Sequence, residues 1–236
     1  MGLCENLIRA VIPSEARNLA LNVFNGRARF LVACGSSEWQ QRRAPTCHTP
    51  PAGYNMRAFI AIDLPESIRA ALRRAQESFR SASPDARWTQ PAGIHLTLKF
   101  LGEVSDGKAR EVCDCLKKLE QFEPFTIRLK GYGFFPDARR PRVFWVGVEE
   151  TPGLSRLAGQ VDAATGSLGF AREERAFRPH LTLARFRMPQ PQPALQALLA
   201  QQAEPELGNF EVSEFFLFES KLSPKGAEYR RVERFP

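Results

Sequence analysis

The sequence predicts an α+β protein made of two pseudo-symmetric lobes, each a mainly antiparallel sheet with two helices, with a cleft between them. From Met56 onward, apolar strands alternate with segments of helical spacing, and the same order of elements occurs twice. Identical residues also recur at a fixed distance, since His180 follows His95 by 85 residues and Leu157 follows Leu72 by 85. Strand or helix periodicity does not preserve residue identity over that distance, so the halves are interpreted as repeats.

Three more pairs of identical residues share this offset. They are Arg57 and Arg142, Phe59 and Phe144, and Phe125 and Phe210. The matches place the lobes at about 56–140 and 141–225, followed by a short tail, within one domain over residues 56–236. Two copies are too few for a solenoid, so we expect the lobes to pair about a pseudo-two-fold axis.

Each lobe is expected to run strand, helix, strand, helix, strand. The expected strands lie at 57–64, 94–102, 125–135, 142–149, 180–186 and 210–220. The expected helices lie at about 65–79, 109–119, 154–168 and 194–199. Pro65 opens the first helix, a position where the missing N–H of proline leaves no helical hydrogen bond unmade.

Residues 1–55 differ from the rest of the chain. They contain six Arg, no Lys and three of the five Cys, with no sustained hydrophobic period. We expect a poorly ordered N-terminal extension with one short helix around 14–23, and no role for His48. Because a clean strand follows Met56 at once, the prefix is interpreted as a start-site artefact, with a genuine flexible arm as the alternative.

Composition limits the class of protein. The formal charge of +7 favours anionic partners such as nucleic acid, although a merely basic protein would carry it too. No apolar run approaches the ~20 residues that span a bilayer. The five cysteines form no Cys-x-x-Cys pair and no metal-ligand group with histidine. We therefore expect a reduced, cytoplasmic, metal-free protein without a cofactor, acting as a monomer.

The four-residue sequence HLTL occurs twice, at 95–98 and at 180–183, and uses two of the three histidines. Alternate residues of a strand face opposite sides, so His95 and Thr97 share one face, as do His180 and Thr182. The leucines then anchor each strand in its own core. If the lobes face each other, the two polar pairs converge on one cleft.

Two histidines and two threonines suit phosphoryl transfer. One imidazole can accept a proton while the other donates one, and threonine hydroxyls can hydrogen-bond phosphate oxygens. A strained cyclic phosphodiester is a fitting substrate, because its leaving oxygen needs no metal ion. A single His-x-Thr in a strand is usually structural. Its duplication at matching positions favours a catalytic role, since packing tolerates substitution.

The segments RAFIAIDLP, HLTLKFLG and RPHLTLAR resemble the two-histidine (2H) phosphoesterase superfamily, in the branch of the RNA 2′,3′-cyclic phosphodiesterases, also called 2′-5′ RNA ligases. The resemblance covers about residues 56–235. It implies an enzyme that opens a 2′,3′-cyclic phosphate at an RNA 3′ end and leaves a 2′-phosphomonoester. By the same resemblance, His95 is the proton donor, His180 is the proton acceptor, and Thr97 and Thr182 hold phosphate oxygens.

Two further residues are candidates for substrate binding. The resemblance suggests that Arg185 contacts the phosphate, but strict alternation places it on the face of Leu181 and Leu183. Arg185 can reach the site only if the strand ends or bulges near Ala184, and an ordinary surface arginine is the alternative. Phe59 can stack on the terminal base. A shared core role with Phe144 is the equal alternative.

The leading hypothesis is a metal-independent RNA 2′,3′-cyclic phosphodiesterase acting on RNA ends, with tRNA-like fragments among the candidates. Two alternatives stay open. One is a 2H phosphoesterase for small cyclic or 2′-5′-linked nucleotides. The other is a non-catalytic RNA-binding module that has kept the cleft.

Overall fold

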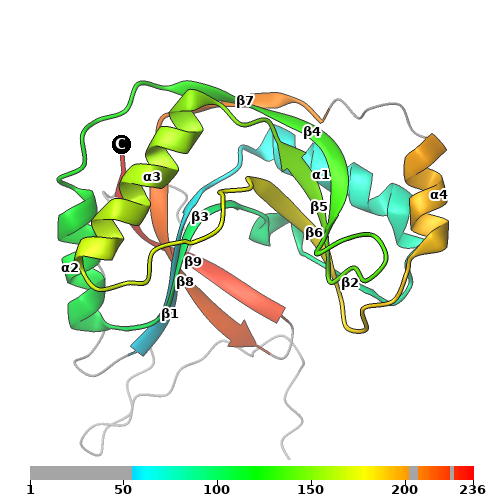
Figure 1. Ribbon diagram of the computed structural model, residues 1–236, viewed down its shortest axis with the longest axis horizontal. Helices are drawn as coiled ribbons and strands as arrows, with labels where there is room; N and C mark the ends of the chain where they lie inside the picture. The colour runs from blue at the N-terminus through cyan, green and yellow to red at the C-terminus, as the bar shows by residue number, and fades with distance from the viewer. Residues whose placement is uncertain (1–54, 202–206, 224–225) are drawn as a thin grey trace, which may run out of the picture. The chain divides into compact units, whose positions relative to one another are not determined.

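The computed structural model describes residues 55–201, 207–223 and 226–236 (Figure 1). Residues 1–54 lie outside the described part of the chain. The expected N-terminal extension, its short helix around 14–23 and the interpretation of Met56 as the start therefore remain predictions. No helix in the described ranges is long and apolar enough to cross a membrane.

The first sheet has the strand order β3-β1-β8-β9. Its strands are β3 (Leu96–Ser105), β1 (Asn55–Ile62), β8 (Phe215–Ser223) and β9 (Gly226–Phe235). Every neighbouring pair is antiparallel. The segment expected to be a tail is therefore the edge strand β9.

The second sheet has the order β2-β6-β5-β4-β7 and is also antiparallel throughout. Its strands are β2 (Ala86–Trp88), β6 (His180–Phe186), β5 (Val143–Val148), β4 (Phe125–Phe135) and β7 (Asn209–Val212). Two antiparallel sheets with helices confirm the predicted α+β class.

The sheets do not coincide with the contiguous halves of the sequence. β4 comes from the first half but pairs with β5 in the second sheet, while β8 comes from the second half and pairs with β1 in the first sheet. The strand expected over 210–220 is divided, because β7 pairs with β4 and the chain then crosses to the other sheet at Ser213 and Glu214. Each sheet thus takes one of its central strands, β8 or β4, from the other repeat.

The helices are exchanged in the same way. α1 (Glu66–Arg80) lies against the second sheet, where the Phe79 ring meets the Phe144 ring edge-on at 5.6 Å between centroids. α3 (Pro152–Ser167) lies against β3 in the first sheet, where Lys99 and Asp162 form an ion pair. Figure 1 shows α2 (Asp106–Leu116) beside α3, and α4 (Pro193–Gln201) on the side of α1.

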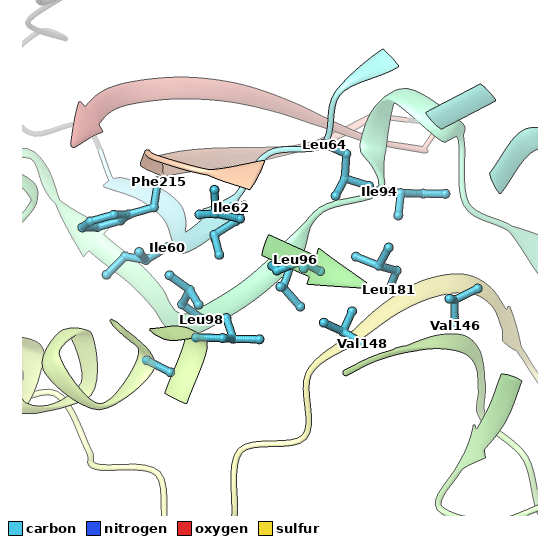
Figure 2. Packing of buried hydrophobic residues seen from close by; sticks show 14 of the residues in the cluster. Ile60, Ile62, Leu64, Ile94, Leu96, Leu98, Val146, Val148, Leu181 and Phe215 are labelled. Carbon is cyan, nitrogen blue, oxygen red and sulfur yellow. The ribbon is translucent and has the colours of Figure 1, made fainter. Parts of the chain in front are cut away.

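One hydrophobic core joins both sheets. It contains alternate residues of β1, β3, β5 and β6 together with the inner faces of α1 and α3. Figure 2 shows Leu96 of β3 and Leu181 of β6 among these side chains, with Val146 and Val148 of β5 alongside. The two motif-bearing strands are therefore fixed to each other through a shared core.

The 85-residue offset does not hold for β1 and β5. Ile60 lies opposite Lys99, as Phe144 lies opposite Ala184, so Ile60 and Phe144 are the structural counterparts. Phe59 and Phe144 are both buried in hydrophobic clusters, as the core alternative expected, but they do not share one core. Phe59 belongs to a separate aromatic cluster on the other face of β1, whereas Phe144 lies in the main core.

Candidate active site

The two HLTL motifs lie on β3 and β6, which belong to different sheets but contact each other. His95 immediately precedes β3, and His180 is the first residue of β6. All four leucines are buried, and both histidines and both threonines are half-buried. The predicted alternation is confirmed for both copies, because the leucines fill the core and the polar side chains face away from it.

Each histidine ring bonds to a carbonyl two residues earlier. Nδ1 of His180 lies 2.8 Å from the carbonyl oxygen of Arg178, and the ring of His95 bonds to the carbonyl of Gly93. A carbonyl only accepts, so Nδ1 of His180 carries the hydrogen and donates it. This bond fixes the ring and leaves Nε2 of His180 as the nitrogen that can exchange a proton with a ligand.

The His95 ring lies on an aromatic cluster. It stacks on Phe59 at 4.4 Å between centroids and meets Tyr229 edge-on at 4.9 Å, with Phe218 at 5.9 Å. Phe59 is only 2% exposed, so it presents almost no surface to a ligand. Phe59 therefore does not serve as the expected platform for a terminal base. Instead, the Phe59 ring packs against one face of the ring of His95, the candidate proton donor.

The His180 ring has fewer aromatic neighbours. Phe135 of β4 meets it edge-on at 4.8 Å between centroids, and Trp145 of β5 lies at 6.3 Å. Phe135 lies opposite Val143, as Phe218 lies opposite Phe59, so Phe135 and Phe218 occupy matching places in the two sheets. The exchanged strands β4 and β8 thus each supply one aromatic ring beside a histidine.

Burial lowers the pKa of both histidines. Desolvation is the main cause in each case, and it lowers the pKa of His95 to about 4. The pKa of His180 is lowered as well, by burial first. The positive charge of Arg185 lowers the pKa of each histidine further, so this guanidinium is close enough to act on both.

A β-bulge brings Arg185 to the polar face. Thr182 lies opposite Trp145 and Ala184 lies opposite Phe144, which leaves Leu183 as an extra residue in β6. Leu183 and Ala184 are both buried, and Arg185 is exposed. The bulge reverses the alternation, so Arg185 faces the same way as Thr182. The structural condition that the sequence set for Arg185 is fulfilled.

Gln76 of α1 holds this bulge and was missed by the sequence reasoning. Its fully buried side chain donates from Nε2 to the carbonyl of Leu183 at 2.9 Å and to that of Thr89 at 2.7 Å. Thr89 N–H also donates to the Leu183 carbonyl at 2.8 Å. A glutamine on the apolar face of a predicted helix was the only available signal, because its partners come from distant segments.

Arg69, on the same helix, holds the turn before His95. Its guanidinium donates to the carbonyls of Leu64, Pro91 and Ile94 at 3.1, 2.8 and 3.2 Å, and it pairs with Asp63. Pro91 to Gly93 form a short 3-10 turn that carries the carbonyl bound by His95. α1 therefore positions both halves of the site, through Arg69 at one and Gln76 at the other.

A pocket of about 310 Å³ opens beside His95. Its wall includes Phe218, Tyr229, Arg69 and Arg231. The described ranges contain no group of three or more His, Cys, Asp or Glu residues that could hold a metal ion.

The LigT-like phosphoesterase family matches the chain twice, over residues 62–145 and 146–229. The two matches reproduce the repeat. The chain belongs to this family. It is a 2H phosphoesterase, and both the predicted family and the two-lobed fold are confirmed.

Curated relatives match this LigT-like phosphoesterase over almost the whole of their own length. An RNA 2′,3′-cyclic phosphodiesterase from Methanothermobacter thermautotrophicus is 38% identical over 181 residues, covering 76% of this chain and 98% of the relative. One from Aquifex aeolicus is 33% identical over 183 residues, covering 76% and 96%.

Solved structures of the family have the same fold. A protein from Thermus thermophilus superposes with a TM-score of 0.65 at 34% identity, covering 76% of this chain and 97% of that one. E. coli LigT in complex with 3′-AMP gives a TM-score of 0.62 at 28% identity, covering 77% and 98%.

Proposed function

We propose that this 2H phosphoesterase hydrolyses the 2′,3′-cyclic phosphate at an RNA 3′ end and leaves a 2′-phosphomonoester. The observation that carries the proposal is the pairing of two His-x-Thr faces on contacting strands, with the charge of Arg185 acting on both histidines. Relatives that match three quarters of the chain are named RNA 2′,3′-cyclic phosphodiesterase, which supports the same substrate. The enzyme acts in the cytoplasm as a monomer.

The reaction is an in-line displacement at phosphorus. Nε2 of His180 accepts a proton from water as the water oxygen forms a bond to phosphorus. The bond from phosphorus to O3′ breaks, and His95 donates a proton to that leaving oxygen. The hydroxyls of Thr97 and Thr182 and the guanidinium of Arg185 donate hydrogen bonds to the non-bridging oxygens. The two histidines then return to their starting protonation states through solvent.

The proton on His95 requires the substrate. With a pKa of about 4, His95 is neutral near pH 7 in the free protein. An anionic phosphate beside the ring favours the charged imidazolium and raises this pKa. In the opposite assignment, His180 is the acid and protonates O2′ as the leaving oxygen, so the phosphate stays on O3′. The position of the product phosphate distinguishes the two arrangements.

We propose that the reaction needs no metal ion, because Arg185 and two hydroxyls supply donors to the phosphate and the histidines move the protons. The test is hydrolysis of an oligoribonucleotide with a 2′,3′-cyclic phosphate end in the presence of EDTA, with the product identified by ³¹P NMR. A 2′-phosphomonoester is expected. Failure to hydrolyse, or dependence on added metal, contradicts the proposal. Nucleoside 2′,3′-cyclic phosphates assayed in parallel separate an RNA enzyme from one for small nucleotides.

A further inference from the structure

Arg87 is the middle residue of the short strand β2, which pairs with the C-terminal half of β6. Its partner across the two strands is Arg185, the candidate phosphate-binding residue. Residues directly opposite each other in an antiparallel pair point to the same side of the sheet, with their Cβ atoms about 4.5–5.5 Å apart. Because Arg185 faces the same way as Thr182, Arg87 also faces the side of the candidate active site.

The two arginines form an unfavourable pair. Like charges directly opposite each other destabilise neighbouring strands. Both side chains are exposed, and within the described part of the chain neither Arg87 nor Arg185 forms an ion pair or a side-chain hydrogen bond. Two guanidinium groups therefore stand next to each other at the active-site face with no anion of the protein to neutralise them. Anionic groups of a ligand would stabilise this arrangement.

A third arginine near β2 lies on its other face. Arg80 is the last residue of α1, and its guanidinium lies over the Trp88 ring at 5.5 Å from the centroid. Trp88 follows Arg87 in β2, so the two side chains point to opposite faces, and Trp88 packs against the main hydrophobic core. Arg80 is thus a cation close to β2 that is directed away from the candidate active site.

The position of Arg87 exists in one sheet only. In the described ranges, the first sheet ends at β3, whereas β2 continues the second sheet beyond β6. The motif on β6 therefore has an additional cation beside it, and the motif on β3 does not. Arg185 is among the main causes of the lowered pKa of both histidines, and Arg87 is not. Arg87 accordingly lies farther from the histidines than Arg185 does.

We propose that Arg87 binds the phosphodiester that joins the terminal nucleotide to the preceding one, while Arg185 binds the reacting phosphate. The inference rests on the proposed function, which places the reacting phosphate at Arg185. The two phosphates stand one nucleotide apart in RNA, and two long side chains on neighbouring strands can contact one each. A nucleoside 2′,3′-cyclic phosphate lacks the second phosphate. Arg87 therefore makes the enzyme favour an RNA end over a small cyclic nucleotide.

The test compares two oligoribonucleotides that end in a 2′,3′-cyclic phosphate and differ in one linkage. The last internal linkage is a phosphodiester in one and a neutral methylphosphonate in the other, with a 2′-deoxyribose before it in both. Arg87→Gln is expected to lower kcat/KM about 10-fold on the first and to leave the second unchanged. Adenosine 2′,3′-cyclic phosphate should also be hydrolysed equally by the variant and the wild type. Arg80→Gln is the matched control and should change none of these rates.

Two further measurements separate a phosphate contact from a structural role. The plot of log kcat/KM against log salt concentration for the phosphodiester substrate should be shallower by about 0.7 in Arg87→Gln, since one phosphate contact is lost. The melting temperature of the variant should not fall, because the substitution removes a like-charge pair. An unchanged salt dependence, equal losses on both oligoribonucleotides, or no loss on the phosphodiester one overturns the role of Arg87.

Failure of the wild-type enzyme on every cyclic phosphate would instead overturn the proposed function. In that case, equilibrium binding of the same two oligoribonucleotides, prepared with a 3′-phosphate end, decides the role of Arg87. Weaker binding of the phosphodiester oligoribonucleotide alone by Arg87→Gln supports the contact. Equal binding of both by the variant and the wild type refutes it.

Discussion

The two His-x-Thr motifs share their backbone but differ in their surroundings. Both histidines bond to the carbonyl two residues earlier, and both strands bulge at the second leucine of the motif. His95, however, lies in an aromatic cluster with a markedly lowered pKa, whereas His180 has fewer ring neighbours. The two repeats therefore share the carbonyl bond and the bulge that orient the histidine and threonine side chains. They differ in the aromatic residues around each histidine.

The comparison predicts the largest effects at the histidines. His95→Ala and His180→Ala should each lower kcat by about 10²–10⁴-fold, because each removes one of two linked proton transfers. The double variant should lose little more than either single variant, since the pair acts as a unit. Rates of cyclic-phosphate RNA hydrolysis provide the measurement. Multiplicative losses, or full activity in both single variants, would rule out paired acid–base roles.

The next largest effect is expected at Arg185. Arg185→Gln should lower kcat/KM by about 10- to 150-fold, because it removes a charged donor to phosphate. Arg187→Gln is the matched control, since Arg187 is exposed and follows the end of β6. Equal behaviour of the two arginine variants would make Arg185 an ordinary surface residue.

A smaller effect is expected at the support of His95. Arg69→Met should lower kcat by about 3- to 30-fold and unfolding free energy by about 1–3 kcal/mol, because it leaves the carbonyls of Pro91 and Ile94 without their donor and removes one of the two arginine partners of Asp63. It should also raise the pKa of His95, which the positive charge of Arg69 now lowers. Assays of kcat against pH, below the unfolding temperature, distinguish positioning from simple instability. Arg73→Met, at an exposed position of the same helix, should change neither quantity measurably.

The smallest effect concerns pH. Both histidine pKa values are lowered, so the bell-shaped profile of kcat/KM for the free enzyme should have both limbs below the ordinary value of 6.5. Above pH 5, kcat/KM should fall steadily as the pH rises, because His95 loses the proton that it donates. In the profile of kcat, the bound phosphate should move the limbs to higher pH. An optimum of kcat/KM above pH 7 would mean that the free protein does not desolvate these rings.

Much of the fold and site could be predicted from local patterns. Alternation places the leucines of HLTL inside and the polar residues outside, because one sheet face is buried. The family resemblance made the two histidines the catalytic candidates, a prediction that the proposed variants test. Strand exchange left no such mark, since the sequence of β4 or of β8 does not show which of the two sheets the strand joins. The bulges were equally hidden, so the sequence left Phe59 open between base stacking and a core role.

The strand exchange has a consequence for the repeat as a unit. β4 and β8 each complete the sheet of the opposite half, and α1 and α3 each cover it. A fragment containing one repeat alone would lack the central strand that the other repeat supplies to its sheet, and the strand beside the gap would become an exposed edge. Such a fragment could close its sheets only by pairing with a second copy, in the manner of a domain-swapped dimer. In the full chain, the covalent link between the two repeats holds the exchanged strands within one molecule.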